Sequence, residues 1–189
     1  LNERNYLYLA DRGRIYGDVR LYDEQGTGIH FYTNREDTIA DQEMTVELSR
    51  IDLKQFKKVL PYLPDVEGWL GGSLHYVDSE GQMMLSADMN LDNFVYEKSP
   101  LGNWTMSGAY LPGDNNAHHV DGFITYNNQE IIYMNGVYQA DETGQENITG
   151  ELELQHFPLR VINPFIPEKM VAFTGDIDGT LSMTGSPMK

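Results

Sequence analysis

The sequence predicts an all-β fold, an antiparallel meander of curved, repetitive β sheet with one or two short helices. Most of the 189 residues alternate between apolar and polar side chains with the period of two that strands require. Clusters of Gly, Asn and Asp interrupt this alternation roughly every 8 to 12 residues, which is the turn spacing of a meander. One sequence pattern also occurs twice, about a hundred residues apart.

The expected strands follow one another with few polar interruptions. They lie at 6–9, 14–22, 29–33, 44–49, 72–77, 82–91, 94–97, 103–111, 120–126, 130–139, 148–155 and 172–183. The polar stretch at 34–42 is predicted to be a loop, and turn residues separate the later strands. We therefore expect residues 1–189 to form a single β-rich segment without an internal linker.

The repeated pattern runs from Val46 to Pro61 and again from Leu152 to Pro167, at an offset of 106 residues. Apolar residues or prolines coincide at 46/152, 48/154, 51/157, 53/159, 56/162, 59/165, 60/166 and 61/167. Each copy then returns to a Gly-rich extended run, so the repeated unit covers about 46–77 and 152–183. A recurring unit of strand, helical turn, proline and strand indicates a repetitive architecture.

Each copy also contains one short helix signal. At 53–60 the apolar residues fall on one helical face, Asp52 can cap the amino end, and Pro61 ends the helix. In the second copy Pro158 stands at the matching start, and Pro164 limits the helix to about one turn.

Composition excludes several classes of function. The formal net charge of −16 disfavours binding to nucleic acid or to an anionic membrane surface. The absence of Cys excludes disulfides, thiolate metal sites and Cys nucleophiles. No apolar run of about 18 residues is present. Because the chain begins with Leu1 and carries no signal peptide pattern, we expect it to be a segment of a longer protein.

No motif indicates an enzyme, a metal site or a cofactor. His118 and His119 are adjacent and would point to opposite faces of a strand, which makes them a poor metal clamp. The Asp176–Gly179 run resembles part of a calcium loop, but no ligands follow at Leu181 or Met183. We therefore predict a protein that is not an enzyme and that needs no cofactor.

Trp69 and Trp104 could form a platform for a sugar, but each lies in an alternating strand, where packing in a core is the more common role.

The remaining signal is the apolar alternation itself. The apolar side chains could fill the core of a closed sandwich, or they could line an open trough. For the second case we predict a groove that binds lipid or a client protein, and the chain's nine Met residues suit flexible acyl chains as well as irregular cores. The predicted lining residues are Leu85, Ala87, Met89, Leu152, Leu154, Ile177 and Leu181.

Two segments resemble TamB-like proteins of the AsmA-like superfamily. The run from Gly150 to Pro167 is similar to their recurrent L-x-L-x-x-x-P-L-x-x-L-N-P-F segment, and the run from Thr174 to Pro187 is similar to their G-x-l-x-G-x-l-x-l-x-G-t-P strand. The first copy follows the pattern more loosely, with Asp52 at the place of Pro158 and Lys58 at that of Pro164. In the rest of the chain the resemblance is limited to the strand-like alternation of apolar and polar residues.

This resemblance implies a periplasmic segment of an inner-membrane-anchored protein of a Gram-negative bacterium. Members of the family form a curved, repetitive, taco-like β trough with an apolar lining and work with an outer-membrane barrel partner of the TamA/BamA type, so the resemblance implies that the antiparallel meander of this chain forms such a trough. The implied cargo is phospholipid or a nascent outer-membrane protein, handled by bridge-like transport or by translocation and assembly. The alternative from the residues is a carbohydrate-binding or adhesion β-sandwich at the cell surface.

Overall fold

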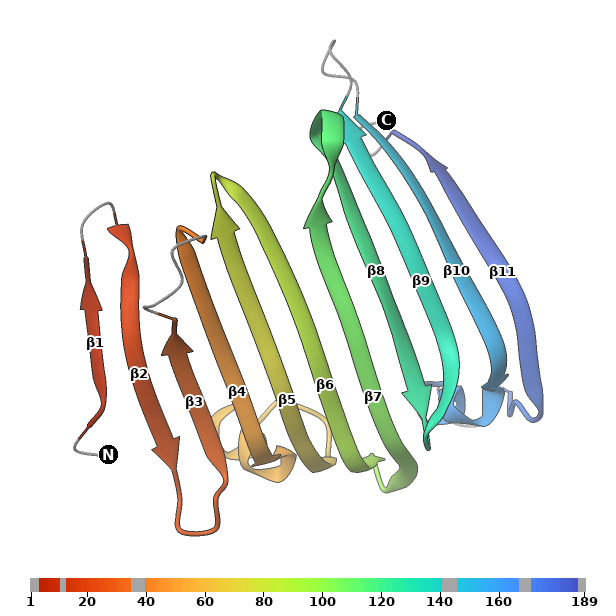
Figure 1. The fold of residues 1–189 in the computed structure, drawn as a ribbon. Helices are drawn as coiled ribbons and strands as arrows, with labels where there is room; N and C mark the ends of the chain where they lie inside the picture. Colours follow the sequence, from red (N-terminus) through yellow and green to blue (C-terminus); the bar gives the residue numbers. More distant parts are fainter. Residues whose placement is uncertain (1–3, 11–12, 35–39, 141–145, 167–170, 187–189) are drawn as a thin grey trace.

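The computed structural model describes residues 4–10, 13–34, 40–140, 146–166 and 171–186. Eleven strands form one open antiparallel sheet in which each strand pairs with the next along the chain (Figure 1). They are β1 (Tyr6–Leu9), β2 (Ile15–Tyr22), β3 (Gly28–Thr33), β4 (Gln42–Asp52), β5 (Val66–Ser79), β6 (Gln82–Tyr96), β7 (Ser99–Pro112), β8 (Ala117–Tyr126), β9 (Gln129–Ala140), β10 (Glu146–Pro158) and β11 (Asp176–Gly185). The predicted all-β antiparallel meander is confirmed, and the described strands do not form a closed sandwich.

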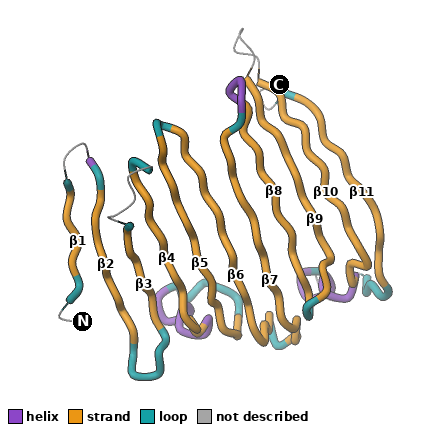
Figure 2. The backbone as a smooth tube through the Cα atoms, in the orientation of Figure 1, coloured by secondary structure: helices purple, strands orange, loops and turns teal. Residues whose placement is uncertain are grey.

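Two short helical segments lie at the lower edge of the sheet as drawn (Figure 2). The first combines η2 (Leu53–Gln55) with α1 (Phe56–Val59), and the second is η4 (Leu159–Phe165). Asp52 caps the first segment as predicted, because its Oδ1 accepts a hydrogen bond from the backbone N of Lys54 at 3.0 Å. A third turn, η3 (Asp114–Asn116), joins β7 to β8.

The two separate strands expected at 82–91 and 94–97 are one strand, β6. Asn93 adopts a left-handed conformation with φ 51°, and the pairing with β7 shifts between Leu91 and Phe94. An extra residue in a β-bulge re-aims a strand without ending it, so the polar interruption at Asp92 and Asn93 does not act as a turn.

The two copies of the repeated pattern carry the same irregularity. The pairing of β4 with β5 shifts between Leu48 and Ile51, and that of β10 with β11 shifts between Leu154 and Phe157. The bulge of β4 contains Arg50 at φ 50°, and that of β10 contains the equivalent residue His156 at φ 48°. Left-handed residues other than Gly are uncommon, so both strands bend by the same unusual device just before the helical segment.

The strands that follow the two helical segments also correspond, at an offset one residue longer than that of the first strands. Gly72 of β5 pairs with Leu48, and Gly179 of β11 pairs with the equivalent Leu154. This register aligns Leu70, Leu74 and Tyr76 with the apolar residues of β11 listed next. Those residues are Ile177, Leu181 and Met183.

The register assigns the side chains to two contrasting faces, because successive residues of a strand point to opposite sides. One row of directly paired residues on the apolar face crosses seven strands. It consists of Leu74, Ala87, Gly108, Gly122, Met134, Leu152 and Leu181. The opposite face carries hydroxyl, amide and carboxylate groups in corresponding rows, such as Ser73 with Asp88 and Ser107. We call these the apolar face and the polar face.

The polar face of β2 to β4 holds a cluster of charged side chains. His30 contacts Asp18 at 2.9 Å through Nε2 and Glu47 at 3.4 Å through Nδ1, and Arg20 also binds Asp18. Burial raises the pKa of Asp18, but the hydrogen bonds from Arg20 and His30 outweigh it and hold the pKa below its ordinary value. The cluster cross-links three strands by side chains.

The hydrogen bonds at the bulge of β10 predict that the stability of the folded state depends on pH. Asp178 of β11 accepts hydrogen bonds from the backbone N and the ring of His156, and the backbone hydrogen bond is the main cause that lowers its pKa from 3.8. A carboxyl group with a lowered pKa stabilises the folded state above its unfolded pKa, and this contribution is lost as the pH falls through the folded pKa. We expect the amide proton of His156 to titrate in NMR spectra with a midpoint below 3.8. An Asp178→Asn variant should show no such titration, and a midpoint above that value would contradict the prediction.

Candidate functional site: the open apolar face

The structure places all seven predicted lining residues on the apolar face. Ala87, Leu152 and Leu181 belong to the row described above. Met89 and Leu154 belong to the adjacent row, which runs through Met106, Ile124 and Ile132. Leu85 lies one row farther toward the upper edge, and Ile177 lies toward η4. The seven residues therefore share one surface that spans β6 to β11, although no measurement assigns them a ligand.

This face remains largely uncovered. Apart from Pro158 and several glycines, the buried apolar residues within the described part of the chain are Leu101, Ala117, Ile131 and Val161. Among the predicted lining residues, Leu85 is 40% exposed and Leu181 is 68% exposed. A face of this length without a covering layer far exceeds the scattered apolar exposure usual on soluble proteins, which marks it as a candidate interaction surface.

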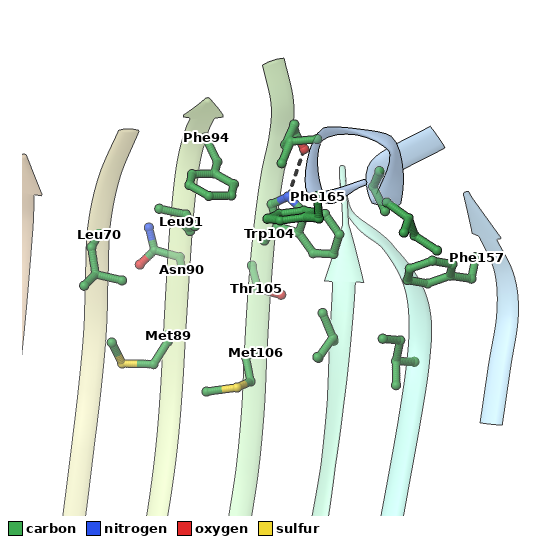
Figure 3. Close-up of a pocket in the computed structure, with 15 residues that line it drawn as sticks. Leu70, Met89, Asn90, Leu91, Phe94, Trp104, Thr105, Met106, Phe157 and Phe165 are labelled. Atoms are coloured by element: carbon green, nitrogen blue, oxygen red, sulfur yellow. Dashed lines mark hydrogen bonds between the residues drawn. The ribbon is translucent and has the colours of Figure 1, made fainter. Parts of the chain in front are cut away.

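One part of the face is a cavity of about 490 Å³ between the sheet and η4 (Figure 3). Its lining residues come from β5 to β9, from the end of β10 and from η4. They are Leu70, Met89, Asn90, Leu91, Phe94, Leu101, Trp104, Thr105, Met106, Ile124, Ile132, Phe157, Val161, Ile162 and Phe165. The two polar members are engaged elsewhere, since Asn90 donates to Asp92 and Thr105 bonds to Thr125. The cavity therefore offers a ligand almost no hydrogen-bonding groups.

Side-chain contacts hold η4 against the sheet. Val161 is 5% exposed, and the ring of Phe165 lies 4.5 Å from that of Tyr96 on β6. Asn163 holds the segment that precedes β11 in place. The Asn163 side chain donates a hydrogen bond to the backbone O of Phe173 at 2.8 Å and accepts one from the backbone N of Phe173 at 2.7 Å. The Asn-Pro-Phe run of the second copy thus has a structural role in closing one end of the apolar face.

Amphipathic aromatic residues border the apolar face near η4. Trp104 donates its indole Nε1 to the backbone O of Leu101 at 2.8 Å and packs against Tyr126, with 4.9 Å between ring centroids. The guanidinium of Arg160 lies 5.9 Å from the ring centre of Tyr126. These contacts satisfy the polar atom of Trp104 and leave its ring as part of the cavity wall, as the sequence-based preference for core packing predicts.

A second aromatic border lies at the other end of the same strands. Tyr110 of β7, His118 of β8 and Tyr138 of β9 stack in succession, with centroid separations of 5.6 and 5.7 Å. The hydroxyl of Tyr110 also bonds to Nδ1 of His118 at 2.5 Å. Such side chains combine an apolar body with a polar tip and suit a boundary between apolar and aqueous surroundings.

Between the two borders lies an aliphatic and Met-rich band. On β7 it extends from Trp104 to Tyr110, a distance of about 20 Å at the rise of about 3.3 Å per residue. Gly108 and Gly122 are paired within the band, and Gly136 and Gly150 are paired in the row of Tyr110 at its margin, so these four positions add no side chain to the face. The band is therefore a shallow, smooth apolar strip with aromatic margins.

Sequence reasoning missed most of the cavity wall. The sequence predicts the short helix after Pro158, but nothing local indicates that η4 folds back onto β6 to β9 and brings Val161, Ile162 and Phe165 into the cavity wall. Trp104, Met106 and Ile124 did carry a usable signal, because they lie in alternating strands and Met106 pairs directly with the predicted Met89, while Trp104 pairs with Leu91 and Ile124 with Met106.

Within the described ranges, no group of three or more His, Cys, Asp and Glu side chains could hold a metal ion. No helix among the residues that the structure describes is both long and apolar enough to cross a membrane. In comparisons with known proteins, no family model, no curated protein and no solved structure matches this chain.

Proposed function

We propose that this chain is a non-enzymatic segment of a TamB-like envelope protein, and that its apolar face carries the acyl chains of phospholipids in bridge-like transport. The observation that supports this most directly is a continuous apolar face on a sheet that has no second layer among the described strands. Each CH₂ group that leaves water for this surface contributes about 0.8 kcal/mol.

The chemistry of the face favours an acyl chain over a client peptide strand. The backbone groups within the sheet are paired with neighbouring strands, so the face itself offers few hydrogen bonds. A peptide laid on it would bury its own N–H and C=O groups without partners, which costs free energy. A hydrocarbon chain has no such groups to satisfy.

The dimensions of the band also suit a lipid. Its length of about 20 Å along the strands is close to half of the hydrocarbon core of a bilayer, which is about 15 Å. The aromatic residues at one margin would then lie near the headgroup of the bound lipid, as Tyr and Trp do at membrane interfaces. The acidic polar face would keep the loaded segment soluble.

The proposed assignment to the periplasm, to an inner-membrane-anchored protein and to an outer-membrane barrel partner rests on the resemblance of the segment from Gly150 to Pro167. Assembly of outer-membrane proteins is the other role that this resemblance implies. The capture of protein rather than lipid in the experiment below would favour that role.

Site-specific photocrosslinking in bacterial cells tests the proposal. A photoreactive residue at Met89 or Leu154 is expected to capture phospholipid, because both positions lie in the same row of the apolar face. Matched probes at Asp88 and Glu153 are adjacent in sequence, but they point to the polar face and should capture none. Mass spectrometry of the crosslinked protein identifies the captured species. Equal lipid capture at both pairs, or none at Met89 and Leu154, would overturn the proposal.

A further inference from the structure

The two tryptophans of the chain have different surroundings. Trp69 pairs with Asp52 of β4 and with Asp92 of β6, while its neighbour Leu70 faces the apolar cavity. Trp69 is therefore on the polar face, opposite from Trp104. Unlike that of Trp104, the indole Nε1 of Trp69 has no hydrogen-bond acceptor among the described residues. Packing alone therefore does not account for Trp69.

Two adjoining hollows share the side chains of Arg50, Trp69 and Asp92. Their volumes are about 330 and 420 Å³, and both are open to solvent. The guanidinium of Arg50 lies 5.2 Å from the centre of the Trp69 ring. No carboxylate in the described part of the chain forms an ion pair with Arg50, although the protein has 29 acidic residues and 13 Lys and Arg residues.

The surrounding polar groups are held in place but are only partly used. Asp92 Oδ2 accepts a hydrogen bond from Asn90 at 3.0 Å, which leaves its second oxygen available. Asn103 Oδ1 accepts from the backbone N of Asn93 at 2.7 Å, which leaves its amide hydrogens available. Donors from Arg50 and Trp69 therefore stand beside a fixed carboxylate acceptor.

In the second copy of the repeated unit, the position equivalent to Arg50 is closed by a side chain of the neighbouring strand. There the left-handed residue His156 is bound by Asp178 through its backbone N at 2.7 Å and its ring at 3.0 Å. In the first copy the residue at the place of Asp178 is Gly71. A Cβ atom at Gly71 would come within 2.7 Å of Asn90 Oδ1, so a larger residue does not fit without a shift. The bulge of β4 therefore stays open where that of β10 is filled.

We propose that Trp69, Arg50 and Asp92 form a binding site for a neutral oligosaccharide on the polar face. One side of a β-linked pyranose ring presents C–H groups that pack on an aromatic ring, and its edge presents hydroxyls that bond to guanidinium, amide and carboxylate groups. Asp52 and Asp92 oppose a phosphate or another anion at this place. The unused polar groups would be left unsatisfied under a purely apolar ligand. The site lies on the face opposite to the proposed lipid surface and does not depend on it.

Titration with chitotetraose and cellotetraose tests this site on the whole chain. In a Trp104→Phe variant, Trp69 is the one remaining tryptophan, so a saturable change in its fluorescence reports binding at Trp69. Calorimetry on the unmodified protein gives the affinity, which we expect to be on the order of 1 mM for a single aromatic platform. Trp69→Ala should abolish binding, and Arg50→Ala or Asp92→Ala should weaken it about tenfold through the loss of charged hydrogen bonds.

Asp88→Ala is the matched control, because Asp88 is a polar-face carboxylate of β6 that bonds to Ser107 outside the hollows. Its affinity for the sugars should be unchanged, and circular dichroism confirms that each variant keeps its strands. The proposal is overturned if neither sugar binds the unmodified protein at about 10 mM. It is also overturned if binding survives Trp69→Ala in a folded variant.

Discussion

Met106→Glu should abolish the capture of phospholipid by this chain. Met106 is in the middle of the apolar band, lines the cavity below η4 and pairs directly with Met89 and Ile124. A carboxylate there would be covered by a bound acyl chain and would lose its water without gaining a partner. The cost is about 2–3 kcal/mol, which corresponds to a loss of affinity on the order of a hundredfold. Lipid bound to the purified protein, quantified by native mass spectrometry, measures the effect.

Leu111→Glu supplies the matched control for this experiment. Leu111 is on the same strand and is 43% exposed, against 44% for Met106, but it lies on the polar face. The two substitutions add the same charge at sites of equal exposure and differ only in the face that receives it. Equal lipid occupancy in the two variants would show that the apolar face is not the site of binding.

Leu101→Ala should give a large loss of stability. Leu101 is 4% exposed, lies in the walls of the cavity and of the hollow behind η4, and its carbonyl accepts the hydrogen bond from Trp104. Truncation of a buried Leu removes transfer free energy and leaves a void, which together cost about 3 kcal/mol. Few side chains in the described sheet are buried. The truncation of Leu101 therefore removes one of the few buried contacts that hold η4 against the sheet.

Urea denaturation followed by circular dichroism measures this change as a lower midpoint with an unchanged slope. Leu111→Ala on the same strand removes the same atoms from a half-exposed site and should cost less than about 1 kcal/mol. If the two midpoints fell by the same amount, the anchoring of η4 by Leu101 would be refuted.

The fold could be predicted because strand alternation is a local signal. The spacing of residues such as Leu85, Ala87 and Met89 is enough to indicate that their side chains share one face of a strand, and turn residues indicate where strands end. The helical segments were also predictable, since Asp52 and Pro158 stand at their starts. The pairing of each strand with its sequence neighbour follows from the short connections.

The candidate site was harder to predict because its depth depends on tertiary contacts. The docking of Val161 and Phe165 onto β6 to β9 has no local signal. The left-handed conformations of Arg50 and His156 could not be predicted either, because Arg does not favour a positive φ and His, although enriched there, adopts other conformations in most proteins. Trp69, like Trp104, was expected in a core because it lies in an alternating strand, but it lies beside open hollows on the polar face.

The neighbour-only pairing of the eleven strands makes this sheet behave as a one-dimensional array. Stability in such an array is close to a sum of nearest-neighbour terms. Strands can therefore add one at a time as the chain emerges during synthesis. Further strands would enlarge the apolar face in proportion to their number, and no central core would have to be repacked.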